Sequence, residues 1–228
     1  MATSLDKSKQ MDFAGLALKT KDVDLSGNLD VTGTMSVTGA TTLGGTALTA
    51  TAAELNRLDD SLAGNALSLG AGVNTTESYS VGISRSGTLI KTEIVVDIST
   101  LIGSATDLDI IGESAAASCH FGQITTAKSG TLVGGSVTCL EAPAGGSTDI
   151  DFYSSTVSTG TQDVIITDAA LGTETALVTA GGAWTSGAVK GMTGLPTAND
   201  YLYIINGAAS GGTFTAGKFL ITLYGLGS

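Results

Sequence analysis

The sequence has little proline, few aromatic residues and little charge. Its 228 residues include 2 prolines, 5% aromatic and 14% charged residues, against 32 glycines and 42% hydrophobic residues. Intrinsic disorder requires low hydrophobicity and high charge, so this composition excludes it. The glycines do not recur at every third position, which excludes a collagen-like chain. Glycine, serine and threonine favour turns and strands over helix interiors, so we expect an all-β protein with many turns.

Basic residues and long apolar runs are also scarce. Ten lysines and arginines against 21 aspartates and glutamates give a formal charge of −11 at pH 7. Nucleic-acid-binding domains need clustered basic residues, so we expect no nucleic-acid partner. No apolar run approaches the roughly 20 residues of a membrane-spanning helix. The apolar stretch 13–18 is too short for a signal peptide. We therefore expect no membrane partner and folding in a cytoplasm.

Cysteine and histidine are nearly absent. The chain has two cysteines, Cys119 and Cys139, and one histidine, His120. Two cysteines make no disulfide framework, and we expect both to be free and buried. Adjacent residues of a strand point to opposite faces, which argues against a catalytic Cys119–His120 pair and against a zinc site with Cys139. We expect no catalytic site, no metal, no cofactor and no enzyme activity.

The aromatic residues divide the chain in two. Only Phe13 precedes Tyr79, and the other ten aromatic residues follow from Tyr79 onward. Because large rings supply much of the buried area of a core, residues 78–228 are predicted to form one β-sandwich domain. Residues 1–50 are predicted to be an extended assembly arm, and residues 51–77 a short helix followed by a Gly/Ser spacer.

The arm contains a short repeat. Glycines fall at positions 27, 33, 39 and 45, six residues apart, with apolar residues between them. Repeats of this size cannot bury an apolar face alone, so we expect an extended, β-rich arm that other subunits complete. A flexible Gly/Ser/Thr linker is the alternative, but a linker needs no alternating apolar residues. The predicted docking residues of the arm are Leu25, Leu29, Val31, Met35, Val37 and Leu43.

Two further segments of the N-terminal part carry docking residues. Four lysines between positions 7 and 21 surround Phe13, Leu16 and Leu18, a pattern typical of a docking peptide, with a disordered tail as the alternative. Thr51 and Glu54 form a capping box, which predicts a helix of about two turns that docks through Leu55 and Leu58.

The C-terminal part has the pattern of short strands separated by glycine turns. Seven or more strands at this spacing predict a sandwich or barrel, because no helical crossovers lie between them. We favour a jelly-roll-like antiparallel β-sandwich over an immunoglobulin-like one, since long strands open and close the domain. The predicted strands are Thr88–Ile98, Phe121–Thr125, Thr131–Leu140, Asp149–Tyr153, Asp163–Thr167, Tyr201–Asn206 and Lys218–Tyr224.

One motif of this part imitates a nucleotide site. Residues 212–218, GTFTAGK, match a phosphate-binding loop as far as the lysine. Phe219 stands where the magnesium-binding hydroxyl belongs, and a strand is predicted to follow in place of a helix. The match is therefore interpreted as false.

Two pairs of aspartates remain as candidates for chemistry. Asp149 and Asp151 are expected on one strand face, as are Asp107 and Asp109. Paired carboxylates suit a glycosidase or a calcium ion shared between subunits. A sugar cleft would also need aromatic rings, and Tyr153 and Trp184 alone do not indicate one. We interpret the four aspartates as solvated residues at strand ends.

Two segments of the N-terminal part resemble a known class of protein. Residues 25–45, LSGNLDVTGTMSVTGATTLGG, and residues 49–59, TATAAELNRLD, resemble elements that recur in tail fibres and head-associated proteins of tailed bacteriophages. Residues 78–228 are loosely similar to phage virion proteins without an assigned role. The resemblance implies a virion structural protein that is assembled in the host cytoplasm.

Within that class, size favours a capsid decoration (cement) protein. Head decoration proteins resemble this chain in having an arm that clasps the shell and one outward β domain, often as homotrimers. The resemblance implies the major capsid protein as partner and the outer capsid surface as location, and the acidic balance suits a position facing away from DNA. A short tail fibre or receptor-binding spike is the alternative. It ranks second because fibres usually carry many more repeats than this chain has. A secreted carbohydrate-binding module ranks third.

Overall fold

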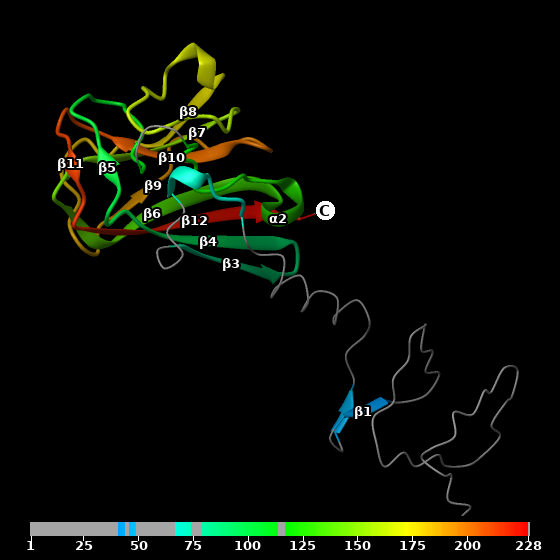
Figure 1. Cartoon of the computed structure of the whole chain (residues 1–228). Helices are drawn as coiled ribbons and strands as arrows, with labels where there is room; N and C mark the ends of the chain where they lie inside the picture. The colour runs from blue at the N-terminus through cyan, green and yellow to red at the C-terminus, as the bar shows by residue number, and fades with distance from the viewer. Residues whose placement is uncertain (1–40, 44–45, 49–66, 74–78, 114–116, 228) are drawn as a thin grey trace, which may run out of the picture. The chain divides into compact units, whose positions relative to one another are not determined.

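The computed structural model describes residues 41–43, 46–48, 67–73, 79–113 and 117–227. The chain divides into two compact units, Met1–Thr49 and Ala50–Ser228. In the first unit, the described residues form one antiparallel strand pair, β1 (Thr41–Leu43) and β2 (Thr46–Leu48). The second unit contains the β domain (Figure 1).

The β domain consists of antiparallel strands joined by loops. Its described helical segments are short: helix α2 (Thr126–Ser129) and the 3-10 turns η1 (Ala71–Val73) and η2 (Ala169–Leu171). No helix in the described ranges is long and apolar enough to cross a membrane. The strands are β3 (Tyr79–Ser86), β4 (Leu89–Asp97), β5 (Ile102–Gly103), β6 (Thr131–Ala144), β7 (Ile150–Ser155), β8 (Glu174–Val178), β9 (Val189–Gly191), β10 (Tyr201–Asn206), β11 (Gly212–Thr213) and β12 (Ala216–Leu226).

The larger sheet has five strands in the order β3-β4-β12-β6-β9, all antiparallel to their neighbours. The last strand, β12, lies at its centre, between β4 and β6. Strands β3 and β4 are joined by the turn Gly87–Thr88, in which Gly87 has a φ of 61°. Glycine adopts this left-handed conformation without a steric penalty, which permits a tight hairpin there.

The second sheet completes a jelly roll. Its order is β10-β7-β8, and the segment 108–111 extends it, because Ile110 forms an antiparallel bridge with Ile205 of β10. The strand pairs are nested along the chain: β4 with β12, 108–111 with β10, β6 with β9, and β7 with β8. Eight strands wound in this way on two sheets form a jelly roll. The predicted all-β, jelly-roll-like antiparallel sandwich is confirmed.

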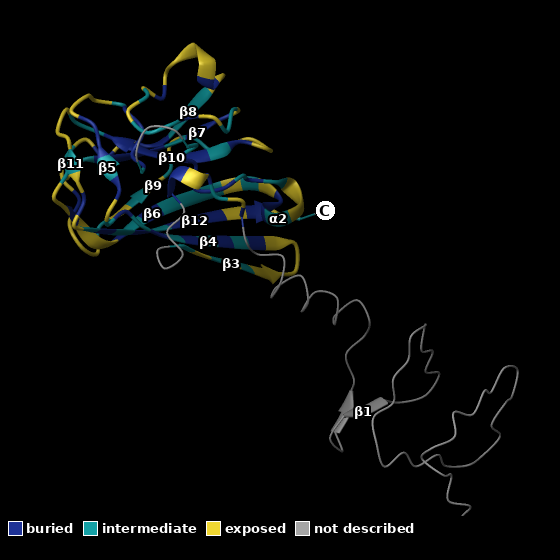
Figure 2. Ribbon diagram, in the orientation of Figure 1, coloured by how far each residue is buried: buried dark blue, intermediate teal, exposed yellow. Residues whose placement is uncertain are grey.

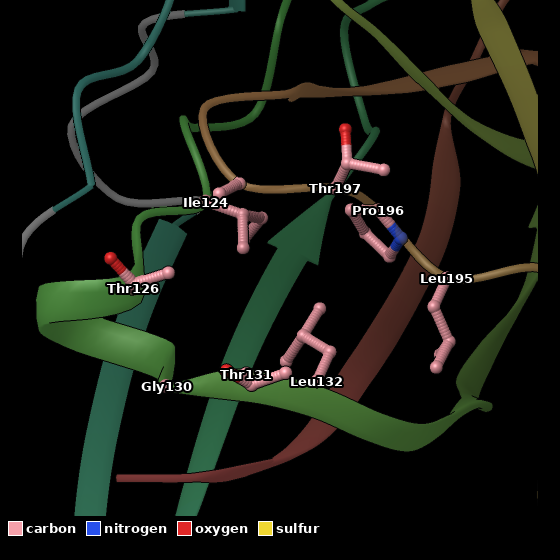
Figure 3. Close-up of a pocket in the computed structure, with 9 residues that line it drawn as sticks. Ile124, Thr126, Gly130, Thr131, Leu132, Leu195, Pro196 and Thr197 are labelled. Atoms are coloured by element: carbon pink, nitrogen blue, oxygen red, sulfur yellow. The ribbon is translucent and has the colours of Figure 1, made fainter. Parts of the chain in front are cut away.

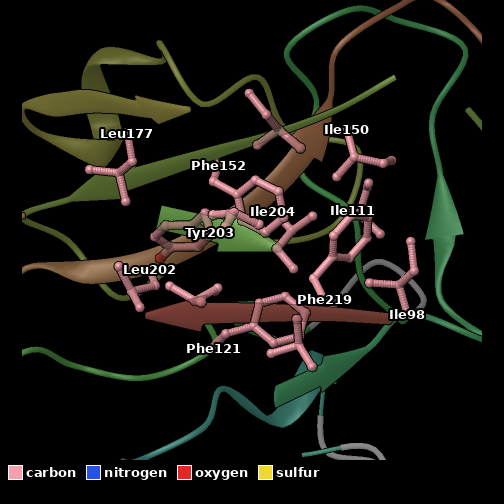
Figure 4. Close-up of a cluster of buried hydrophobic side chains, with 14 of the residues drawn as sticks. Ile98, Ile111, Phe121, Ile150, Phe152, Leu177, Leu202, Tyr203, Ile204 and Phe219 are labelled. Carbon is pink, nitrogen blue, oxygen red and sulfur yellow. The ribbon is translucent and has the colours of Figure 1, made fainter. Parts of the chain in front are cut away.

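The core lies between the two sheets, which face each other in Figure 1. Phe219 of β12 is fully buried, and its ring centroid lies 5.2 Å from that of Phe152 of β7 and 5.4 Å from that of Trp184. The indole N–H of Trp184 donates to the carbonyl of Ile150 at 2.7 Å, which satisfies its one polar atom. Figure 4 shows the rings of Phe152 and Phe219 among aliphatic side chains of both sheets, and Figure 2 shows that the buried residues concentrate between the layers.

Alternation along the strands explains this core. In β4 every second residue is buried, from Ile90 through Ile94 to Val96, and the residues between them are half-buried. Opposite them, Phe219 and Ile221 of β12 are the register partners of Val96 and Ile94. Because side chains of a strand alternate between faces, one face of this sheet forms the core and the other points away from it.

The sequence predicted five of the strands correctly. Strand β10 has the predicted bounds, and β4, β6, β7 and β12 overlap four other predicted ranges with different ends. The predicted strands Phe121–Thr125 and Asp163–Thr167 are wrong, since each contributes only a single bridge. Asp163, at the start of the second range, has a φ of 67° and is not extended, and neither segment runs alongside a neighbouring strand for more than one bridge.

The β domain also uses residues before position 78. Leu67 and Val73 are each 3% exposed and belong to the core. The N–H groups of Gly70 and Gly72 donate to the carbonyls of His120 and Ser118, both at 2.8 Å. Part of the segment predicted as a spacer therefore packs into the domain. The predicted helix 51–60 lies outside the described residues.

Replacing Phe219 by alanine tests the contact between the sheets. We expect Phe219→Ala to lower the free energy of unfolding by about 3–5 kcal/mol, because it leaves a cavity between Phe152 and Trp184. Tyr224→Ala on the opposite face of the same strand is the control and should cost less than about 1 kcal/mol. The measurement is urea denaturation followed by circular dichroism. Equal losses in both variants would contradict this view of the core.

Candidate docking surface

The single histidine lies in an aromatic environment. His120 is 6% exposed, and its ring centroid lies 4.9 Å from that of Tyr201 and 6.3 Å from that of Tyr203, both edge-on. Its Nδ1 atom is buried without a hydrogen-bond partner among the described residues. Burial lowers the pKa of His120, so the ring is neutral at pH 7. This geometry is that of a packed side chain, since nothing orients Nδ1 for proton transfer.

The two cysteines are free and buried, as expected. The Cys119 thiol donates to the carbonyl of Ala117 at 3.2 Å, and the Cys139 thiol to that of Glu141 at 3.2 Å. Burial raises the pKa of Cys119 to about 11 and also raises that of Cys139. The thiolate is the reactive form, so neither thiol is activated at neutral pH. In the described part of the chain, no three His, Cys, Asp or Glu side chains gather as a metal-binding group.

The phosphate-loop match has no phosphate-binding geometry. Residues 212–218 contain the two-residue strand β11 and the start of β12, so a strand follows the lysine, as predicted. Lys218 forms an ion pair with Asp97 at 3.2 Å on the outer face of the larger sheet. A phosphate-binding loop needs a helix N-terminus at this point, and the backbone here is extended.

The aspartates are not all solvated, which corrects the interpretation from sequence. Asp151 is 6% exposed and Asp109 4%. The N–H of Ala180 donates to Oδ1 of Asp151 at 2.5 Å, and the hydroxyl of Ser104 donates to Oδ2 of Asp109 at 2.6 Å. Neighbouring loops cover these carboxylates and supply their donors, which an alternating strand pattern cannot indicate. Asp107 is exposed.

Asp149 and Asp151 converge on one glycine. A Cβ atom at Gly207 would lie 2.7 Å from Oδ1 of Asp149 and 2.9 Å from Oδ1 of Asp151. Oδ1 of Asp149 is buried and has no hydrogen-bond partner within the described ranges. Burial, together with the negative charges of Asp149 and Asp107, raises the pKa of Asp151 above its usual value. Ionisation of Asp151 is therefore unfavourable in the folded state, first because the carboxylate is buried and then because of the neighbouring negative charges.

A cavity of about 400 Å³ opens between helix α2 and the loop before β10 (Figure 3). Ile124, Leu132, Leu195 and Pro196 supply its apolar wall, and Thr126 and Thr197 contribute side chains at its rim. None of its lining residues is ionisable. Such a lining can accept an apolar side chain but supplies no acid, base or nucleophile.

Several exposed apolar side chains lie among polar ones on the outer face of the five-stranded sheet. By register, its central strands β4 and β12 point the pairs Val95–Leu220 and Leu89–Leu226 outward, with Tyr224 between these rows. Leu89 is 41% exposed, Tyr224 37% and Leu226 47%. Exposed apolar side chains grouped on one face mark interaction surfaces. We call this face the outer sheet face.

Charge is distributed unevenly around the β domain. The outer sheet face carries two lysines and three carboxylates. Both ion pairs found among the described residues, Lys91–Glu93 at 2.7 Å and Lys218–Asp97 at 3.2 Å, lie on it. The remaining described residues of the domain include one arginine, two lysines and nine carboxylates. The outer sheet face is therefore nearly neutral, while the acidic charge belongs to the loops and the other sheet.

Of the eleven predicted docking residues, only Leu43 belongs to the described part of the chain. Leu43 lies in β1, opposite Thr46 of β2. The other ten fall outside the described residues: Phe13, Leu16, Leu18, Leu25, Leu29, Val31, Met35, Val37, Leu55 and Leu58. The outer sheet face was not predicted. The alternation of residues 220–226 indicates that the strand has two different faces, but the sequence does not say which face the second sheet covers.

No family model, curated protein or solved structure matches this chain. The jelly roll is shared by viral capsid proteins, lectins and cupins, so the fold does not select one function. An argument about function must therefore start from the surface and the sequence.

Asp151→Asn is expected to stabilise the protein at neutral pH. Because the folded state raises the pKa of Asp151, ionisation costs stability as the pH rises through the folded pKa. Asparagine keeps the acceptor for the Ala180 N–H and has no charge. We expect the midpoint of thermal unfolding to rise by a few degrees at pH 7, and the gain to vanish below the usual aspartate pKa of 3.8.

The matched control for this prediction is Glu141→Gln, which removes one exposed carboxylate away from the pair. It should change the thermal midpoint little at either pH. An equal gain in both variants would attribute the effect to net charge, and a loss in Asp151→Asn at pH 7 would contradict the prediction.

Proposed function

We propose that this chain is a structural protein of a tailed-bacteriophage virion, and specifically a capsid decoration protein. The observation that carries the proposal is the pair of N-terminal segments, 25–45 and 49–59, which resemble elements of phage virion proteins. Its partner is then the major capsid protein and its location the outer surface of the capsid. No enzymatic step is part of the proposal.

The charge distribution supports an outward β domain. Away from the outer sheet face, the described part of the domain has six exposed or half-buried carboxylates against three basic residues. Such a surface repels packaged DNA and keeps neighbouring virions apart. A jelly roll that builds its own core between two sheets is also suited to project from a shell as a rigid unit.

In the proposed mechanism the arm provides the attachment. Apolar residues of the arm, such as Leu29, Val31 and Val37, bury against neighbouring capsid subunits, and each adds a modest free energy of transfer. Assembly of the chain as a homotrimer would join three arms, so that avidity rises without new contacts. The shell then resists internal pressure better.

Deleting residues 1–50 tests the proposal. We expect the remaining chain to stay folded and soluble, because the described core begins at Leu67, and to lose binding to capsids. The measurement is co-sedimentation with capsids stripped of this protein. Leu29→Ser with Val37→Ser in the full chain should weaken binding, whereas Thr32→Ser with Thr34→Ser in the same segment should not. Unchanged capsid binding by the deleted chain would refute the proposal.

A short tail fibre or receptor-binding spike is the second candidate, because jelly rolls also serve as lectin domains. It predicts that the β domain binds host cells or their glycans. Immunogold labelling of virions separates the two, since the decoration protein is labelled on the head and the fibre on the tail.

A further inference from the structure

The outer sheet face carries large outward side chains and also glycines that have no side chain. Gly82 of β3, Gly134 of β6 and Gly191 of β9 all belong to it by register, and a Cβ atom at any of them would meet nothing within 4 Å. None of these glycines has a positive φ, so the backbone conformation does not require them. Their effect is to leave shallow hollows on both sides of the central strands.

Large side chains stand between the hollows. Tyr224 is the register neighbour of Gly134, and Leu226 is the neighbour of Leu89. Val189 of β9, 62% exposed, stands beside Thr138 on the same face. One surface thus presents apolar projections and the hollows that could receive them, which is what contact between identical surfaces requires.

The charge of the chain restricts where two copies can meet. At a net charge of −11, copies repel one another through most of their surface. On the outer sheet face, Lys91 and Lys218 neutralise Glu93 and Asp97 within the same molecule. Contact through this face brings little net charge together and covers the exposed side chains of Leu89, Tyr224 and Leu226.

We propose that a second copy of this chain packs against the outer sheet face. Tyr224 and Leu226 of one copy lie over the hollows at Gly82 and Gly134 of the other, at the spacing of about 10 Å that packed sheets adopt. This contact pairs two copies of the free protein in solution, so it is separate from the homotrimer proposed for the capsid and does not depend on binding to a capsid.

Gly82→Arg combined with Gly134→Arg in the full chain tests the proposal. Both positions have open space for a side chain, and strands favour other residues over glycine, so the variant should unfold at the same temperature as the natural chain or higher. The arginines also reduce the net negative charge, which by itself would favour association. We nevertheless expect the dissociation constant, measured by sedimentation equilibrium, to rise at least about tenfold, because the side chains fill the hollows.

Ile165→Arg is the matched control. Ile165 is 38% exposed and lies beside Asp109, away from the outer sheet face. We expect this variant to associate like the natural chain, with the same average molar mass in sedimentation equilibrium. A monomeric natural chain, or an unchanged dissociation constant in the double variant, would overturn the proposal.

Capsid binding, measured separately, distinguishes the two proposals. If the double variant keeps its mass but loses capsid binding, the capsid covers this face, and the self-association proposal is overturned while the decoration function stands. If it dissociates and deletion of residues 1–50 leaves capsid binding intact, the self-association proposal stands and the decoration mechanism fails.

Discussion

The contact of Phe219 with Phe152 and Trp184 is the interaction on which the β domain depends. It joins the central strand of the five-stranded sheet to β7 of the other sheet through three edge-on rings. With only 5% aromatic residues, the chain concentrates a large share of its bulky side chains at this one place. The remaining core is aliphatic and packs around the rings, because small Gly-rich strands alone would bury too little apolar area.

The same alternation that buries Phe219 exposes Tyr224 and Leu226. Strand β12 has one face in the core and one face outside it, and its position at the centre of the sheet places the outward residues in the middle of a broad surface. Glycines on β3 and β6 keep that surface low on either side. Core formation and the proposed association of copies therefore follow from one strand and its period of two.

The two sides of the domain also differ in charge. The ion pairs Lys91–Glu93 and Lys218–Asp97 keep the outer sheet face nearly neutral, whereas most carboxylates lie in loops and on the other sheet. Asp149 and Asp151 both lie next to Gly207, and burial of Asp151 makes its ionisation costly for stability. An acidic surface with one neutral, apolar face suits a protein that assembles in a defined orientation, which agrees with the proposed role in a virion.

The sequence by itself determined the all-β class, five strands and the buried, unreactive cysteines, because period-two patterns and side-chain chemistry are local properties. Only the tertiary structure decided the rest. Two predicted strands, Phe121–Thr125 and Asp163–Thr167, found no neighbouring strand to pair with beyond a single bridge, and loops buried Asp109 and Asp151. Which face of β12 points outward depends on where the second sheet packs. Contacts between residues far apart in the chain decide that, and no local pattern records them.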